Sequence, residues 1–365
     1  MRTSNTNAQL THPESLDSDA TRARLDPSGL RHRLGALPGH CREAWQQAQG
    51  LAPHNQGSRI DKVVIGGMGG SAIAGDLVAD LAALQQTVPV IVVRDLSLPF
   101  SLDQNSLFIG CSHSGSTEET MSLFQQARRQ DAWLLALAGG GKLLAEATAA
   151  GIPSLTINTP GEPRSAVGYN LMLLLGALNQ YGVVNAGGAE VEAAITTLQA
   201  QVSQLSEGVP VQNNLAKQIA LELPDKLVVV YGGGFFTGMA RRWKTQLNEN
   251  AKAWAFFETL PELLHNSVEA FNTPSEGMQD KIVLVLRPNI ENIDLQSRYR
   301  VVAELLKQKS IPNRIVAAGR GTPLAQMLSM LTLGDYVSYY LAMLHGVDPS
   351  PIPAISQGKQ LLAGR

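Results

Sequence analysis

Short apolar runs alternate with helical patterns along most of this chain, and this alternation limits the possible folds more than any other feature. The runs lie at 61–66, 88–93, 106–111, 132–137 and 153–157, and again at 226–231, 255–259, 281–286 and 313–317. Continuous apolar runs of this length are typical of strands that are buried on both faces of a parallel sheet. Strands that alternate with helices form right-handed βαβ units. The sequence therefore predicts an α/β protein with doubly wound parallel sheets.

One unit occurs twice, namely a strand that runs into a glycine-rich turn and then into a helix. It is found near 61–85 and again near 226–252. Between the two copies, Gly182 and the pair Gly187 and Gly188 interrupt the helical patterns. We therefore predict two α/β halves, residues 26–187 and residues 188–365, each built as an αβα sandwich. Residues 1–25 are mostly polar, and we predict that they form a mobile tail.

The composition argues against several classes of protein. The chain has 29 Lys and Arg against 31 Asp and Glu, so its net charge of -2 gives no electrostatic reason to expect nucleic acid or an anionic membrane as a partner. The two cysteines form no CxxC pair and the seven histidines show no HxxxH or HxH spacing, which argues against a disulfide scaffold and a zinc site. No stretch of about 18 apolar residues could span a bilayer, and the first residues lack the apolar core of a signal peptide. The expected location is the cytoplasm.

A cluster of hydroxyl side chains follows the third apolar run. Ser112, Ser114, Ser116 and Thr117 lie between that run and the helical pattern at 121–130. Unpaired amides at a helix N-terminus attract anions, and Gly115 lets the backbone approach a ligand closely. This pattern predicts a site for a phosphate monoester. The alternative is a plain capping turn, because Ser and Thr cap helices without any ligand.

The first glycine-rich turn also has two interpretations. The stretch Gly-Met-Gly-Gly-Ser at 67–71 formally matches a dinucleotide-binding fingerprint, and Asp95 follows the next strand, a little later than such a fingerprint requires. Alternatively, Gly70 and Ser71 form a second wall of the phosphate site. Ligands of open parallel sheets bind outside the carboxyl ends of the strands, where both loops are expected to lie.

Three further polar residues are candidates for catalysis, and each has a plainer interpretation. Glu249 lies on the helix that follows the second glycine-rich turn, where it could simply belong to a solvated face. His265 follows Pro261, and a lone histidine is more often structural than catalytic. Arg164 lies in a loop after a strand, where it could be an ordinary surface arginine.

Taken together, these residues resemble the bifunctional phosphoglucose/phosphomannose isomerase family, which is built from sugar isomerase (SIS) domains. The matching stretches are GMGGS at 67–71, SHSGST at 112–117, PRSAVGY at 163–169, NEN at 248–250, HN at 265–266 and PAISQGK at 353–359, in the order typical of the family. The hydroxyl loop alone would indicate only a phosphosugar binder. The Arg, Glu, His and Lys landmarks make the resemblance specific to the isomerases.

The resemblance implies a role for each of these positions. The residues that it implies for the sugar-phosphate cradle are Gly70, Ser71, Ser112, Ser114 and Thr117. Glu249 is implied as the base that moves a proton between C1 and C2, and Arg164 as the cation beside the cis-enediolate. His265 and Lys359 are implied as the pair that opens the sugar ring, with His265 supplied by the neighbouring subunit of a homodimer. The family implies two SIS subdomains and no cofactor or metal.

The predicted activity is therefore the interconversion of glucose 6-phosphate and fructose 6-phosphate, with mannose 6-phosphate as a further candidate substrate. One carboxylate can remove a proton next to a carbonyl and return it to the adjacent carbon, and a fixed guanidinium can stabilise the enediolate. Such a reaction belongs to glycolysis and gluconeogenesis. The alternatives are a non-catalytic SIS module that senses a phosphosugar and a nucleotide-dependent enzyme that uses the turn at Gly67. The segment 348–352 could influence the choice between glucose and mannose.

Overall fold

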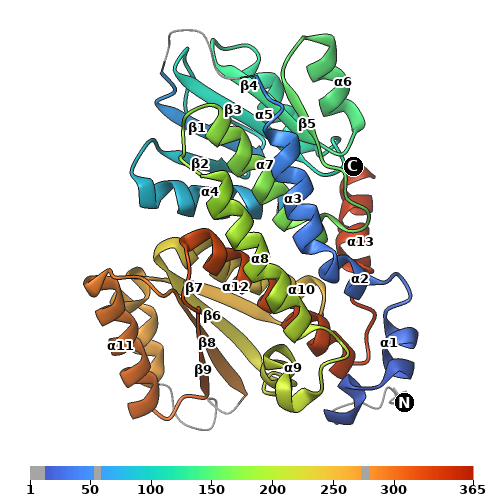
Figure 1. Cartoon of the computed structure of the whole chain (residues 1–365), viewed down its shortest axis with the longest axis vertical. Helices are drawn as coiled ribbons and strands as arrows, with labels where there is room; N and C mark the ends of the chain where they lie inside the picture. The colour runs from blue at the N-terminus through green and yellow to red at the C-terminus, as the bar shows by residue number, and fades with distance from the viewer. Residues whose placement is uncertain (1–12, 53–58, 273–279, 365) are drawn as a thin grey trace.

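The computed structural model describes residues 13–52, 59–272 and 280–364, and it contains two parallel sheets stacked along the long axis of the molecule (Figure 1). The first sheet has the order β2-β1-β3-β4-β5 and the second has the order β7-β6-β8-β9. The strands of the first sheet are β1 (Lys62–Gly67), β2 (Val90–Val93), β3 (Ser106–Ser112), β4 (Trp133–Ala138) and β5 (Ser154–Thr156). Those of the second are β6 (Leu227–Gly233), β7 (Ala255–Leu260), β8 (Lys281–Arg287) and β9 (Asn313–Ala317). The predicted strands and the parallel, mixed α/β class are confirmed.

Helices cover both faces of the first sheet. Val63 and Ile65 of β1 belong to the apolar cluster that contains α4 and α7, whereas Val64 belongs to the cluster that contains α5 and α6. Successive side chains of a strand point to opposite faces, so this split shows a three-layer arrangement. The helices of this half are α2 (Leu30–Gly35), α3 (Leu37–Ala48), α4 (Gly69–Gln85), α5 (Glu118–Ala127), α6 (Gly141–Ala149), η2 (Pro163–Ala166) and α7 (Val167–Gln180).

The second half is organised around one buried helix. Of the 22 residues of α12 (Pro323–Leu344), those from Leu324 to Leu344 are buried with the exception of Ser329. This helix packs against α8, α9 and α10. The remaining helices of this half are α8 (Gly188–Leu205), η3 (Val211–Asn213), α9 (Leu215–Leu221), η4 (Gly234–Phe236), α10 (Thr237–Glu249), η5 (Glu262–His265), η6 (Ser267–Asn272), α11 (Ile293–Gln308) and α13 (Pro353–Ala363). The sequence analysis did not predict α11, which lies between β8 and β9 and buries Tyr299 and Val302 against the sheet.

The prediction of a mobile tail is wrong for residues 13–25. These residues form η1 (Pro13–Leu16) and α1 (Asp19–Leu25), which pack against α12. Leu16 is 1% exposed, and the Lys217 Nζ donates a hydrogen bond to Asp17 Oδ1 at 2.7 Å. A few apolar side chains and the ion pair with Lys217 therefore fix a segment whose composition is mostly polar. Residues 1–12 lie outside the described residues, and the boundary between halves at residue 187 stays a prediction.

Charged side chains join the two halves. Asp80 on α4 accepts a hydrogen bond from the Gly238 amide at the start of α10, at 2.7 Å. Beside it, Asp76 pairs with Arg94 and, at 3.1 Å, with Arg241. Burial raises the pKa of Asp80 to about 7. The first half thus supplies a carboxyl group to the N-terminus of a helix in the second half.

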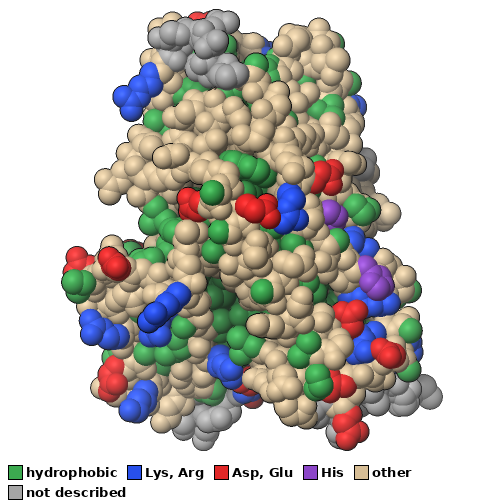
Figure 2. All heavy atoms as spheres, in the orientation of Figure 1, with side chains coloured by type: hydrophobic (Ala, Val, Ile, Leu, Met, Phe, Trp, Pro, Cys, Tyr) green, Lys and Arg blue, Asp and Glu red, His purple; other side chains and the backbone are tan. Residues whose placement is uncertain are grey.

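The surface gives two further observations. On the face shown in Figure 2, acidic and basic side chains are scattered and do not form one field of a single sign. The C-terminal helix α13 lies at the edge of the molecule (Figure 1), and its Leu361 and Leu362 are 67% and 70% exposed. Across the ranges that the structure describes, no helix combines the length and apolar character needed to cross a bilayer.

Candidate active site

The hydroxyl loop lies at the carboxyl end of β3, next to the end of β1. Gly67 of β1 pairs in register with Cys111 of β3, so the two loops that follow these strands are neighbours. The Ser112 and Thr117 hydroxyl oxygens lie 2.8 Å apart, and the Gly115 amide donates to Ser112 Oγ at 3.1 Å. Gly115 has a φ of +64°, and a Cβ there would lie 1.8 Å from the carbonyl oxygen of Gly140. Only glycine fits this turn, which folds the hydroxyls back toward the N-terminus of α5.

The other predicted phosphate residues adjoin this loop. Ser71 is 3% exposed and shares a side-chain hydrogen bond with the Cys111 thiol, which burial keeps protonated by raising its pKa to about 12. Ser114 is exposed, and its Oγ accepts from the Ser116 amide at 3.3 Å. A Cβ at Gly70 would lie 2.7 Å from the Pro163 carbonyl, so the first turn of α4 touches η2. The structure therefore places the five predicted phosphate residues in two neighbouring loops, and the turn at Gly70 contacts η2, which carries Arg164.

Arg164 is a buried residue and not the surface arginine of the plainer interpretation. Its side chain is 2% exposed. The Nε donates to Asn250 Oδ1 at 2.6 Å, and Nη2 donates to the carbonyls of Pro349 and Ser350 at 2.8 and 2.7 Å. Burial lowers the pKa of this guanidinium, and the nearby Glu249 opposes the shift. Three acceptors thus fix the group in one orientation.

The remaining nitrogen of the guanidinium faces the predicted base. Arg164 Nη1 lies 3.6 Å from Glu249 Oε2, and the Glu249 side chain is 25% exposed. Within the described parts of the chain, this buried Nη1 has no hydrogen-bond partner. Glu249 and Arg164 lie 85 positions apart in sequence, and the fold places them side by side at the end of α10. A partly exposed carboxylate beside a buried cation with free hydrogens is an arrangement that can act on a bound anion or enediolate.

Behind Arg164 lies a buried polar network that the sequence analysis did not assign. Arg242 Nη2 donates to the Arg164 carbonyl at 2.7 Å and to Asp335 Oδ1 at 2.8 Å. Gln246 Nε2 donates to the same carboxylate oxygen at 2.6 Å, and burial raises the pKa of Asp335. The Asn250 Nδ2 donates to Ser338 Oγ at 3.0 Å. The available signal was the spacing of polar residues 242, 246 and 250, which follow one face of α10 to the residue that caps its C-terminus.

Lys252 is a second residue that the sequence analysis missed. It follows the end of α10, and its Nζ donates to the Glu249 carbonyl at 2.7 Å and to the Pro349 carbonyl at 3.0 Å. Burial of the ammonium group and the neighbouring Arg164 lower the pKa of Lys252 to about 8. No sequence motif marks this lysine, because its partners are fixed by the fold.

The structure does not bring His265 or Lys359 to the Arg164–Glu249 pair within one chain. His265 is exposed in η5, which follows β7 at the edge of the sheet where the carboxyl ends of the strands lie. Helix α10 begins at this same edge, after β6, and Glu249 is its last residue. A helix of 13 residues is about 20 Å long, so Glu249 and His265 lie at opposite edges. Lys359 lies on the exposed helix α13, and no hydrogen bond or ion pair joins it to Glu249 in the described chain.

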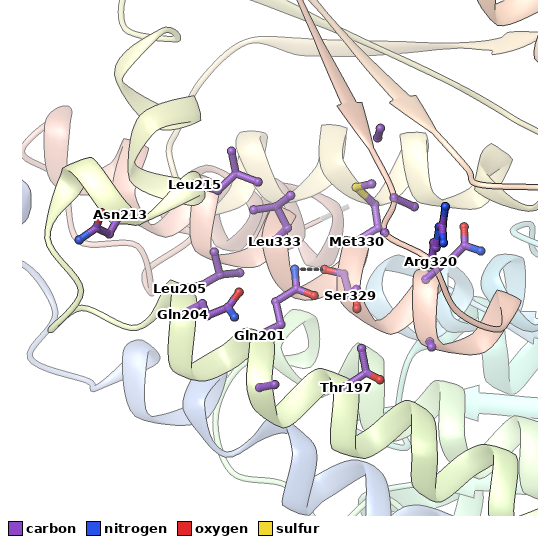
Figure 3. Close-up of a pocket in the computed structure, with 16 residues that line it drawn as sticks. Thr197, Gln201, Gln204, Leu205, Asn213, Leu215, Arg320, Ser329, Met330 and Leu333 are labelled. Atoms are coloured by element: carbon purple, nitrogen blue, oxygen red, sulfur yellow. Dashed lines mark hydrogen bonds between the residues drawn. The ribbon is translucent and has the colours of Figure 1, made fainter.

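Two of the cavities in the described part of the second half bear on the position of the site. The cavity in Figure 3 has a volume of about 350 Å³ and lies between α8 and the first turns of α12, with Gln201, Arg320 and Met330 among its lining residues. It contains none of the predicted site residues. A groove of about 310 Å³ is lined by Asn248 and Lys252, which flank Glu249 in sequence, together with exposed aromatic residues. The second cavity therefore lies next to the predicted base.

Comparisons with known proteins agree with this fold. The sequence model of the bacterial phosphoglucose isomerase C-terminal SIS domain matches residues 212–362. A glucose-6-phosphate isomerase-like protein from Thermus thermophilus superposes with a TM-score of 0.61 at 18% identity, covering 94% of this chain and 98% of that chain. The fold is therefore that of the SIS-domain phosphosugar proteins.

Closer sequence relatives define the family. The chain is 35% identical over 329 residues to a bifunctional phosphoglucose/phosphomannose isomerase from Caldicellulosiruptor bescii, a match that covers 90% of this chain and 97% of that protein. It is 32% identical over 307 residues to a protein of the same name from Thermoplasma volcanium, covering 84% of this chain and 92% of that protein. The chain belongs to the bifunctional phosphoglucose/phosphomannose isomerase family. These relatives are isomerases, which favours an enzyme over the non-catalytic sensor.

Proposed function

We propose that this enzyme interconverts glucose 6-phosphate and fructose 6-phosphate, and that it also accepts mannose 6-phosphate. The observation that carries the proposal is the distance of 3.6 Å between Arg164 Nη1 and Glu249 Oε2. The helix η2, which carries Arg164, contacts the turn at Gly70, and this turn neighbours the hydroxyl loop. An aldose–ketose isomerisation needs these three parts together: a grip on the phosphate, a carboxylate base and a fixed cation.

In the proposed reaction, the Glu249 carboxylate removes the proton from C2 of the open aldose and returns it to C1. Between these steps the proton of the C2 hydroxyl passes to the oxygen on C1, so the aldehyde becomes a hydroxyl and C2 becomes the ketone. The enediolate that forms carries negative charge, which the free Nη1 of Arg164 stabilises. Because Arg164 is already held by three acceptors, little reorganisation is needed when this charge develops. The hydroxyls of Ser112 and Thr117 and the amides of the loop bind the phosphate, which positions the reacting carbons.

Ring opening requires a donor at the ring oxygen and an acceptor at the anomeric hydroxyl, and we assign these roles to His265 and Lys359. Because His265 and Glu249 lie at opposite edges of one sheet, His265 of the partner subunit is the candidate that reaches Glu249. The exposed Leu361 and Leu362 of α13 support a homodimer, since association would bury them. We place the enzyme in the cytoplasm, in the glycolytic and gluconeogenic exchange of hexose phosphates.

A coupled assay with fructose 6-phosphate tests the proposal. Glu249→Gln should lower kcat by at least about 1,000-fold, because the variant has no base, while the affinity for the sugar phosphate changes little. The matched control is Glu258→Gln, an exposed carboxylate of β7. If Glu249→Gln turns over near the wild-type rate, the base assignment is wrong.

Mixed dimers test the shared site. In a heterodimer of Glu249→Gln and His265→Ala chains, one site has both native residues only if His265 crosses the interface. Random association then restores about a quarter of the wild-type activity from two inactive variants. If the mixture remains inactive although heterodimers form, His265 does not act across subunits.

A further inference from the structure

The carbonyl oxygen of Pro349 receives hydrogen bonds from two cations of the proposed site. Arg164 Nη2 lies 2.8 Å from it and Lys252 Nζ lies 3.0 Å from it. The same Nζ donates to the Glu249 carbonyl at 2.7 Å. One ammonium group therefore connects the end of α10, which carries Glu249, to the segment 348–350, which holds Arg164.

Helix capping explains only the first of the two Lys252 bonds. The last carbonyls of a helix lack partners within the helix, and a lysine just beyond the end commonly donates to one of them. Lys252 has a φ of +55°, which turns the chain back so that its side chain reaches Glu249. Capping does not require the second bond, to a residue 97 positions further along the chain.

The segment 348–350 is held from other directions as well. Arg164 Nη2 donates to the Ser350 carbonyl at 2.7 Å, and Arg33 Nη2 donates to Ser350 Oγ at 3.4 Å. The Ser350 amide donates to Asp348 Oδ1 at 2.9 Å. Because this segment is fixed, it can act as a common support for Lys252 and Arg164.

The geometry of the Arg164–Glu249 pair indicates why such a support is needed. At 3.6 Å, Nη1 and Oε2 attract each other strongly, yet they are too far apart for a hydrogen bond. A small shift of the end of α10 would let them close into a direct ion pair. The carboxylate would then be engaged by the guanidinium and would be a poorer base for the sugar.

We propose that Lys252 is a positioning residue that holds Glu249 at its working distance from Arg164 by tying both to the Pro349 carbonyl. This inference rests on the proposed function, which assigns the base to Glu249 and the enediolate cation to Arg164.

The charges around Lys252 make this support sensitive to pH. Burial of the Lys252 ammonium group lowers its pKa, and the facing cation Arg164 on η2 lowers the pKa further. The carboxylates of Asp348, Glu249 and Glu162 raise the pKa, and the balance of these effects is a pKa of about 8. The ammonium form is therefore lost as the pH rises through about 8. The charge that strengthens both hydrogen bonds is lost with it, so kcat should fall over this range.

Kinetics on two variants test the positioning role. Lys252→Met removes the donor and should lower kcat at pH 7 about tenfold while KM for fructose 6-phosphate changes less than about twofold, because the phosphate loop is untouched. Lys252→Arg restores a cationic donor, so it should recover most of kcat and move the alkaline fall in kcat upward by more than about one pH unit. The matched control is Lys244→Met, a lysine of the same groove. Wild-type kcat in Lys252→Met, or an equal loss in Lys244→Met, overturns the proposal.

Hydrogen exchange separates this inference from the proposed function, because it needs no activity. Amides of the segment 347–356 should exchange about tenfold faster in Lys252→Met than in wild type or Lys244→Met, since one of the bonds that hold the segment is missing. Unchanged exchange overturns the proposed tie to Pro349. A wild-type enzyme without isomerase activity overturns the proposed function and the positioning role with it, even if faster exchange is observed.

Discussion

Substitution of Asn250 by alanine is the most direct test of how Arg164 is held. The Asn250 side chain is fully buried, and it forms two hydrogen bonds. Its Oδ1 accepts from Arg164 Nε at 2.6 Å, and its Nδ2 donates to Ser338 Oγ at 3.0 Å. Alanine removes both bonds and leaves Nε without an acceptor beside Nη1, which is already unpaired in the described chain.

The expected cost follows from the two bonds. A hydrogen bond from a charged donor contributes about 1.5–3 kcal/mol and a neutral one about 1 kcal/mol, so Asn250→Ala should destabilise the protein by about 3 kcal/mol. The entropy of unfolding is about 2.1 cal/mol/K per residue, which for 365 residues amounts to about 0.8 kcal/mol/K. The melting temperature should therefore fall by about 4 °C if the chain unfolds as one unit.

Calorimetric melting curves of two variants separate the contributions. Ser338→Ala removes two neutral bonds, the one that Ser338 Oγ accepts from Asn250 and the one that it donates to the Asp335 carbonyl at 2.9 Å, and should lower Tm by about 2–3 °C. Asn250→Ala should lower it by about 4 °C and should also lower kcat, because the guanidinium loses an anchor. If the two variants melt at the same temperature and Asn250→Ala keeps wild-type kcat, Asn250 does not hold Arg164.

Three further predictions concern the phosphate loop and the junction between the halves. Ser112→Ala should raise KM for fructose 6-phosphate about tenfold in steady-state assays with a smaller change in kcat, because it removes one hydrogen bond to the phosphate; an unchanged KM would exclude that contact. Gly115→Ala places a Cβ against the carbonyl of Gly140, so it should lower Tm by at least about 3 °C and abolish phosphate binding in calorimetry; a wild-type Tm would contradict the packing of this loop. The pKa of Asp80 is raised to about 7, so its contribution to stability is lost as the pH rises toward 7, and Asp80→Asn removes this dependence. Titration of a partly exposed group contributes about 2 kcal/mol to the free energy of unfolding here, so the Tm of Asp80→Asn minus that of wild type should increase by about 3 °C between pH 5 and pH 8. A difference in Tm that stays constant over this range would show that Asp80 does not titrate there.

The features that the sequence predicted well are local ones. The nine strands found in the described ranges and the hydroxyl loop each depend on a few consecutive residues. A short apolar run between turns favours a buried strand whatever its distant partners are. Arg164 and Glu249 were predicted from a resemblance, and only the fold brings them together. The exposed positions of His265 and Lys359 could not be predicted, because both residues lie on the surface of the single chain, where no side-chain hydrogen bond or ion pair within its described part fixes them.

The features that sequence analysis missed depend on distant partners. Lys252 lies in no motif, and what marks it is the hydrogen bond to the carbonyl of Pro349, a residue 97 positions further along the chain. The segment 13–25 has the composition of a tail, yet Leu16 and Asp17 find partners in the second half. In both cases the information lies in the tertiary arrangement, because each residue alone is compatible with a solvated surface.

The burial of α12 on all sides has a consequence for how the protein is made. This helix follows α1, α8, α9 and α10 in the chain, but α8, α9 and α10 need it to cover their apolar faces, and α1 packs against it as well. Until residue 344 leaves the ribosome, those faces have no partner. The second half therefore completes its folding only after α12 has been synthesised, and we expect chaperones to bind ribosome-held chains that stop before residue 323 more strongly than chains that include α12.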